Sequence, residues 1–159
     1  MANSESGLTM KDGVLMFKGQ PEPVPWWVKG PVINSVTEHK KKLREWKEKV
    51  ALAVKDRRGG DPWCSDHLYA VTLQFHFRPL RNQKQDVDNF VKPVLDGLAA
   101  GLFLSEDQDV REIPTFAAQH GVDDSNFRIL LIHRLRNAET EAEEGVRLFV
   151  SSTGNAPPG

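Results

Sequence analysis

A two-residue alternation of apolar and polar side chains runs from Leu68 to Phe77, with the apolar set at Tyr69, Val71, Leu73, Phe75 and Phe77. Because successive side chains of a strand point to opposite faces, this pattern predicts a strand with one buried face. Two more strands are predicted at Val110–Ala118 and Phe127–Leu135, paired as a hairpin around residues 121–125. Shorter strands are predicted at Val14–Phe17 and at Val146–Val150, the second of them as a small edge strand.

Apolar residues spaced by three and four predict two helices. The first follows a capping box at Ser35–Glu38 and ends at Gly59–Gly60, with its buried stripe at Leu43, Trp46, Val50, Ala53 and Val54. The second begins near residues 89–92, with Asp88 or Asn89 as its cap, and closes at Gly101. Its stripe consists of Val87, Phe90, Val91, Val94, Leu95, Leu98 and Leu102, and Pro93 is tolerated because it falls in the first turn.

Four prolines between Gly19 and Pro31 predict a loop. Trp26 and Trp27 in this segment either pack beneath it or stack on bases, and packing is the preferred interpretation. The elements together predict an α+β fold, with a mixed or antiparallel sheet of about four strands and two helices packed on one face. We expect a flexible N-terminus at 1–13, a single domain at 14–150 and a disordered tail at 151–159.

The composition is that of a soluble protein, for which we expect a cytoplasmic location and no membrane association. The chain of 159 residues is 39% hydrophobic, without an apolar run of membrane-spanning length, and its single cysteine, Cys64, forms no internal disulfide. Lys and Arg number 21 against 22 Asp and Glu, so the molecule has no overall basic excess. Basic residues are nevertheless dense between Lys40 and Arg58, as a solvated helix face or as a contact for the DNA backbone. Arg78, Arg81 and Lys84 are expected to contact DNA.

Carboxylates gather at both ends of the second predicted helix. Asp86 and Asp88 precede it, and alternate residues of an extended segment face the same side, so these two can converge on one ion. Oxygen ligands suit Mg²⁺ or Mn²⁺, and Mg²⁺ commonly takes further ligands from phosphate. The pattern therefore favours phosphodiester hydrolysis, with Lys92 within a turn of the metal. Taken singly, the same acids are also typical of turns and helix caps, but that interpretation gives no reason for Lys92.

The run DVDNFVKPVLDGL, followed by an acidic pair and Val110, resembles the signature of the RusA family of Holliday-junction resolvases. The resemblance implies a RusA-like fold and a small dimeric, Mg²⁺-dependent endodeoxyribonuclease that acts on four-way DNA junctions in recombination and repair. It also implies that Asp86, Asp88 and Asp107 bind the metal and that Lys92 is required for catalysis.

The sequence departs from the family pattern at two positions. Glu106 stands where the first aspartate of the acidic pair is usual, and Asp109 where a glutamine is common. Asp107 keeps the second position of the pair and ranks first as third ligand, while Asp109 would share its face in an extended segment. Two other functions stay open, a non-catalytic junction-binding accessory protein of the same fold and a nuclease for other branched DNA. Because resolving a junction takes two symmetric nicks, we expect a homodimer.

Overall fold

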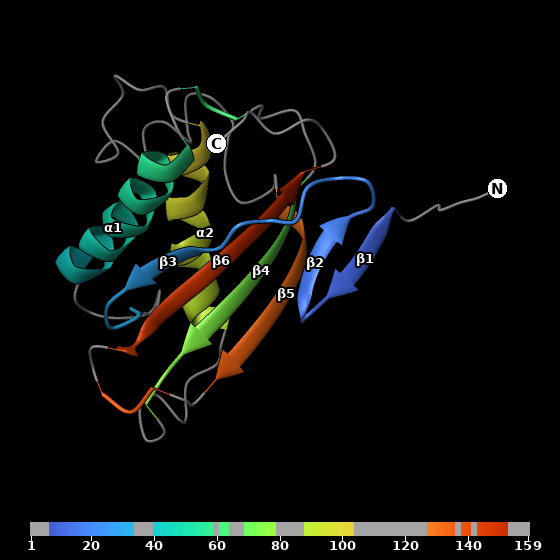
Figure 1. The fold of residues 1–159 in the computed structure, drawn as a ribbon. Helices are drawn as coiled ribbons and strands as arrows, with labels where there is room; N and C mark the ends of the chain where they lie inside the picture. Colours follow the sequence, from blue (N-terminus) through green and yellow to red (C-terminus); the bar gives the residue numbers. More distant parts are fainter. Residues whose placement is uncertain are drawn as a thin grey trace.

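A computed structural model describes residues 7–33, 40–58, 61–63, 69–78, 88–103, 127–135, 138–140 and 143–152. Its main sheet has four strands in the order β3 (Trp26–Lys29), β6 (Gly145–Ser152), β4 (Tyr69–His76) and β5 (Phe127–Leu135). β4 and β5 are parallel, whereas β6 is antiparallel to both β3 and β4. Helices α1 (Lys40–Arg58) and α2 (Asp88–Phe103) lie on one face of the sheet (Figure 1). The predicted α+β fold is confirmed, and the sheet is mixed.

The core lies between this face of the sheet and the two helices. The predicted apolar alternation of β4 is confirmed, since Tyr69, Val71, Leu73, Phe75 and Phe77 are all buried. The stripe of α2 packs against them, and Phe75, Phe77 and Phe90 form a cluster of rings with centroids 5.1 to 6.4 Å apart. Parallel strands require a crossover connection rather than a tight turn. Helix α2 lies within the crossover from β4 to β5, which fixes its direction.

A hairpin of β1 (Leu8–Lys11) and β2 (Val14–Phe17) packs on the opposite face of the sheet. The backbone N–H of Leu15 donates to Thr72 Oγ1 at 3.0 Å, and that of Phe17 donates to Ser151 Oγ at 2.9 Å. β2 coincides with the predicted strand, but the apolar pattern predicted no regular structure before it. The signal for β1 is the two-residue turn, Asp12 and Gly13, whose φ angles of 53° and 79° are those of a hairpin loop.

The prediction of an unbroken loop between Gly19 and Pro31 was wrong for residues 26–29. This stretch contains no proline, and its backbone pairs as β3 with β6 at the edge of the sheet. Trp26 is 7% exposed and its ring centroid lies 5.9 Å from that of Trp63, so packing is confirmed for this tryptophan. Trp27 points to the other face, where it is 39% exposed and lies edge-on to His76.

The predicted edge position of the last strand was also wrong, because β6 lies between β3 and β4. Val146, Leu148 and Val150 alternate into the core, which is typical of an interior strand. Gly145 permits the pairing with β3, since a Cβ there would lie 2.4 Å from the carbonyl oxygen of Val28. Strand β5 matches its predicted range but pairs in parallel with β4. Its predicted hairpin partner, Val110–Ala118, lies outside the described residues.

Helix α2 begins at Asp88 and continues through Gly101 to Phe103, so the predicted closure at Gly101 was wrong, and Pro93 lies in the second turn rather than the first. The carbonyl of Gly101 accepts a hydrogen bond from Arg58 Nε at 2.7 Å, and that of Leu102 accepts one from Trp63 N at 2.8 Å. These bonds satisfy carbonyls that a helix end leaves without an intrahelical partner. Arg58 is therefore a buried structural residue and not a contact for the DNA backbone.

Candidate metal and nucleic-acid site

The predicted catalytic motif begins at one end of the sheet, where β4 ends and α2 starts (Figure 1). Asp88 is the first residue of α2, and Arg78 is the last described residue after β4. Asp86 precedes Asp88 by two residues, so their Cα atoms are at most about 7 Å apart. The described part of the motif thus starts with Asp88 at the N-terminal end of α2.

The structure describes only part of the predicted site. Asp86, Asp107, the alternative ligand Asp109, and the predicted DNA contacts Arg81 and Lys84 lie outside the described residues. Asp88 is described through its backbone, and Lys92 and Arg78 are described in full. Within the described residues, no three His, Cys, Asp or Glu side chains come together as metal ligands. The predicted metal ligands therefore remain a prediction.

Lys92 is held by a carboxylate one turn further along α2. Its Nζ donates to Asp96 Oδ1 at 2.8 Å, and the other oxygen of Asp96 accepts a contact from Lys47 Nζ of α1 at 3.1 Å. The lysine side chain is 52% exposed, whereas that of Asp96 is 17% exposed. Asp96 therefore forms a half-buried bridge between the motif lysine and a lysine of the neighbouring helix.

Two glycines four residues apart bring α1 close enough to α2 for this bridge. A Cβ on Gly97 would lie 2.7 Å from the carbonyl oxygen of Lys47, and one on Gly101 would lie 2.7 Å from that of Ala51. The two helices thus run side by side in the same direction, backbone against backbone. The glycine next to Asp96 contacts the residue that supplies the second ammonium group, so the helix packing and the ionic bridge depend on the same close approach.

Arg78 contacts a buried acid from the other end of the chain. Its Nε donates to Glu144 Oε1 at 3.1 Å, and Glu144 lies immediately before β6. Arg134 of β5 also lies near this end of the sheet, with its guanidinium carbon 5.3 Å from the ring centre of Phe77. The described part of the motif end therefore carries cations from α1, α2, β5 and the end of β4. The sequence interpretation named Lys92 and Arg78 as candidate site residues, but it did not predict their contacts with Asp96 and Glu144 or the contact of Lys47 with Asp96.

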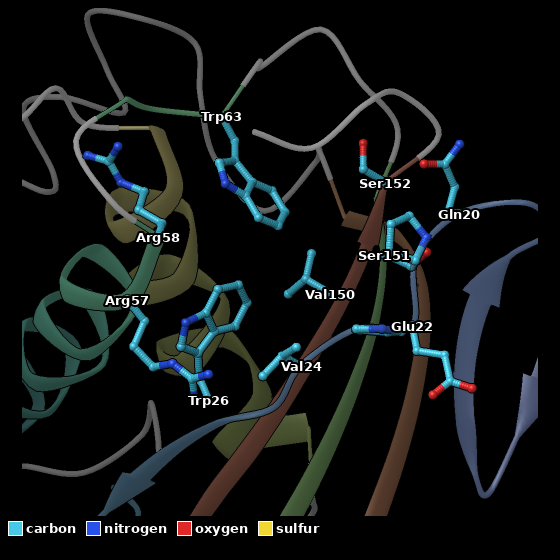
Figure 2. Close-up of a pocket in the computed structure, with 12 residues that line it drawn as sticks. Gln20, Glu22, Val24, Trp26, Arg57, Arg58, Trp63, Val150, Ser151 and Ser152 are labelled. Atoms are coloured by element: carbon cyan, nitrogen blue, oxygen red, sulfur yellow. The ribbon is translucent and has the colours of Figure 1, made fainter. Parts of the chain in front are cut away.

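A separate hollow of about 380 Å³ lies at the opposite end, where α1 and β6 end (Figure 2). The rings of Trp26 and Trp63 line it, together with Val150 and the last serines of β6. Arg57 also borders it and donates from Nη1 to the carbonyl oxygen of Pro25 at 2.6 Å. No residue of the motif helix is among those that line it, so this hollow is distinct from the candidate site.

Comparison with known families identifies the class of protein. A family model described as Endodeoxyribonuclease RusA matches residues 20–128, which is more than half of the chain. The protein therefore belongs to the RusA endodeoxyribonuclease family, a family of nucleases that act on branched DNA. No curated protein and no solved structure matches the chain. The matched region spans β3, α1, β4, α2 and the start of β5, and leaves out β1, β2 and β6. Neither α1 nor α2 combines the length and the apolar content needed to cross a lipid bilayer.

Proposed function

We propose that the protein is a Mg²⁺-dependent endodeoxyribonuclease that resolves Holliday junctions by paired, symmetric nicks during DNA recombination and repair. Family membership carries the proposal, because the D-x-D-N run with its lysine falls within the matched region. The described contacts support it, since Asp96 holds Lys92 on α2 one turn from Asp88, the first residue of that helix.

The residues of the motif fit a hard cation. Asp86 and Asp88 offer oxygen ligands at the start of α2, and Asp107 is the first choice for a third. Mg²⁺, or Mn²⁺ in its place, would polarise the scissile phosphate and supply an activated water. Lys92 would stabilise the negative charge that develops on the phosphate oxygens. Asp96 would keep the Lys92 ammonium in place before the substrate arrives, which avoids reorganisation during the reaction.

The length of α2 constrains the third ligand. Its 16 residues extend about 24 Å, so its first and last residues lie far apart. Four residues lead from Phe103 to Asp107 and span at most about 14 Å, whereas the six to Asp109 span about 21 Å. Within one chain Asp109 returns to the start of α2 more readily than Asp107 does. The two carboxylate side chains and the ion that they share add to this reach, so Asp107 can also complete the site within one chain.

A homodimer also fits the substrate. One carboxylate cluster cuts one strand at a time, and a four-way junction requires two nicks placed symmetrically about its centre. Two copies related by a two-fold axis would match the near two-fold symmetry of the junction, as dimeric DNA readers match palindromic sites. Light scattering should therefore give the mass of two chains.

The decisive experiment compares cleavage and binding of a four-way junction. The protein should cleave in Mg²⁺ and should bind without cleavage in Ca²⁺. Asp88→Asn should abolish cleavage while binding stays intact or tightens, because one negative charge near the phosphates is lost. Cleavage by Asp88→Asn at the unmodified rate would refute the metal assignment. Binding by the unmodified protein without cleavage would favour the junction-binding accessory protein, and unpaired nicks in other branched DNA would favour a general branched-DNA nuclease.

A further inference from the structure

Glu144 is a fully buried acid outside the region that the family model matches. Its side chain is 0% exposed, and it lies directly before β6, the strand that the matched residues 20–128 do not include. An ionised carboxylate in a protein interior is strongly destabilising unless it is paired and hydrogen-bonded. The contact with Arg78 gives Glu144 a partner that is both paired and hydrogen-bonded.

The pair is asymmetric in exposure. Arg78 Nε donates to Glu144 Oε1 at 3.1 Å, and the arginine side chain is 42% exposed while that of Glu144 is fully buried. This bond engages Nε, and a guanidinium has four more N–H donors on its two terminal amino groups. That outer edge has the forked geometry that binds a phosphate through two parallel hydrogen bonds. The buried carboxylate of Glu144 thus orients Arg78, which extends toward the surface.

Both residues are fixed at the end of the sheet where the motif begins. Phe77, the residue before Arg78, donates from N to the carbonyl oxygen of Leu135 at 2.8 Å and accepts at its own carbonyl from Ala138 N at 3.2 Å. The carbonyl of Glu144 accepts from Gly30 N at 3.0 Å. Nine residues separate Arg78 from Asp88, and the chain starts and finishes that connection at the same end of the sheet (Figure 1). A phosphate bound by Arg78 would therefore lie on the side of the molecule that carries the aspartates.

We propose that Glu144 is a positioning residue, which holds Arg78 through Nε so that the amino groups of Arg78 bind a phosphate of the DNA backbone beside the motif carboxylates. The inference rests on the proposed function, because it needs a DNA substrate at this end of the sheet. It adds a residue beyond the matched region to the machinery of the site, and it assigns Arg78 a phosphate contact rather than a base contact.

The test is a double-mutant cycle on DNA binding. Binding of a fluorescent four-way junction is measured in Ca²⁺ at several salt concentrations for Arg78→Gln, Glu144→Gln and the double variant. Arg78→Gln should weaken binding about tenfold and lower the slope of log K against log salt by about one, the effect of losing one phosphate contact. Glu144→Gln should weaken binding several-fold in the unmodified protein but by less than about twofold in the Arg78→Gln background. The isosteric glutamine removes a buried charge, so the fold should be retained, and a melting curve checks this.

Two controls separate positioning from general charge effects. Arg78→Lys keeps the charge but loses the fork, so it should retain the salt slope and recover only part of the affinity. Lys18→Gln removes a cation from the exposed turn that follows β2, outside the basic run of α1, and should leave the salt slope unchanged. Equal effects of Glu144→Gln with and without Arg78, or an unchanged salt slope in Arg78→Gln, would overturn the role of Glu144 alone. Failure of the unmodified protein to bind junctions more tightly than duplex DNA would overturn the proposed function itself.

Discussion

Replacing Asp96 with asparagine removes one negative charge from between two ammonium groups. Asp96 contacts Lys92 Nζ at 2.8 Å and Lys47 Nζ at 3.1 Å. The asparagine keeps the size of the side chain and one oxygen acceptor, so the change affects charge rather than packing. Lys92 should lose its fixed position, because the neutral amide attracts its ammonium group less and Lys47 then repels it.

The cost in stability should be small. The side chains of Lys92 and Lys47 are 52% and 27% exposed, and solvent screens such pairs, each of which contributes about 0.2 to 1 kcal/mol. A total loss of about 1 kcal/mol lowers the Tm of a domain of this size by about 2 to 4 °C. The loss in catalysis should be larger, because a misplaced group that acts in the transition state reduces the rate about 10- to 100-fold.

The assay separates these effects by their sign. Junction affinity in Ca²⁺ should stay equal or increase, since a negative charge near the phosphates has been removed, while kcat in Mg²⁺ should fall. Asp56→Asn is the matched control, because it removes the same charge from an exposed position near the C-terminal end of α1. This control should change neither affinity nor kcat by more than about twofold.

Two results would refute the role of Asp96. Cleavage by Asp96→Asn within twofold of the unmodified rate would show that Lys92 does not need its partner. A fall in affinity as large as the fall in kcat would show that Asp96 acts on DNA binding rather than on a catalytic role of Lys92.

Four further predictions concern the same end of the fold and the packing behind it. Lys92→Ala should lower kcat far more than it weakens junction binding, and equal losses would make Lys92 a binding contact only. Gly97→Ala should reduce the free energy of unfolding by about 1 to 3 kcal/mol in chemical denaturation, since its Cβ would lie 2.7 Å from the carbonyl oxygen of Lys47. Unchanged stability would mean that α1 can shift away from α2 without cost. Arg58→Met should destabilise by about 1 to 3 kcal/mol, because the carbonyl of Gly101 loses a buried donor, and junction affinity should not change. Mixing inactive Asp88→Asn and Asp107→Asn chains should restore partial cleavage if Asp107 completes the site of a second copy. A site built within one chain gives no such recovery, because every site then carries one of the two changes.

The strongest periodic patterns predicted the elements well. The alternation of β4 and the stripe of α2 depend on burial alone, and the structure buries the apolar side of both. Strand β3 was missed because it is short and lies between Pro25 and Pro31. Its structure depends on pairing with β6, which the local sequence does not reveal. The central place of β6 was missed for the same reason, since strand order is set by pairing between distant segments.

In the candidate site too, neighbours within one segment could be predicted from the sequence, whereas contacts between distant segments could not. The four-residue spacing of Lys92 and Asp96 is visible in the sequence, and so is the proximity of Arg78 to the aspartates. Lys47 was counted with a basic run and Glu144 was not singled out, because nothing near either residue in the chain indicates its partner. The four-residue spacing of Gly97 and Gly101 was a usable signal, since small residues at that spacing indicate close packing of helices and hence a neighbour for Asp96.

The ionic contacts described at the motif end share one feature, which would let a chain with a net charge of −1 bind a polyanionic substrate there. In each, the acid is less exposed than its cation, at 17% against 52% for Asp96 and Lys92 and at 0% against 42% for Glu144 and Arg78. The carboxylates are set back from the surface and the cations extend beyond them. DNA that approaches these pairs would meet the cations before the acids. At moderate salt, charges more than about 10 Å away are largely screened, so the net charge of the whole chain has little effect at this range. Under the proposed function, DNA binding therefore depends on the arrangement of charge at this end of the fold rather than on an overall basic excess.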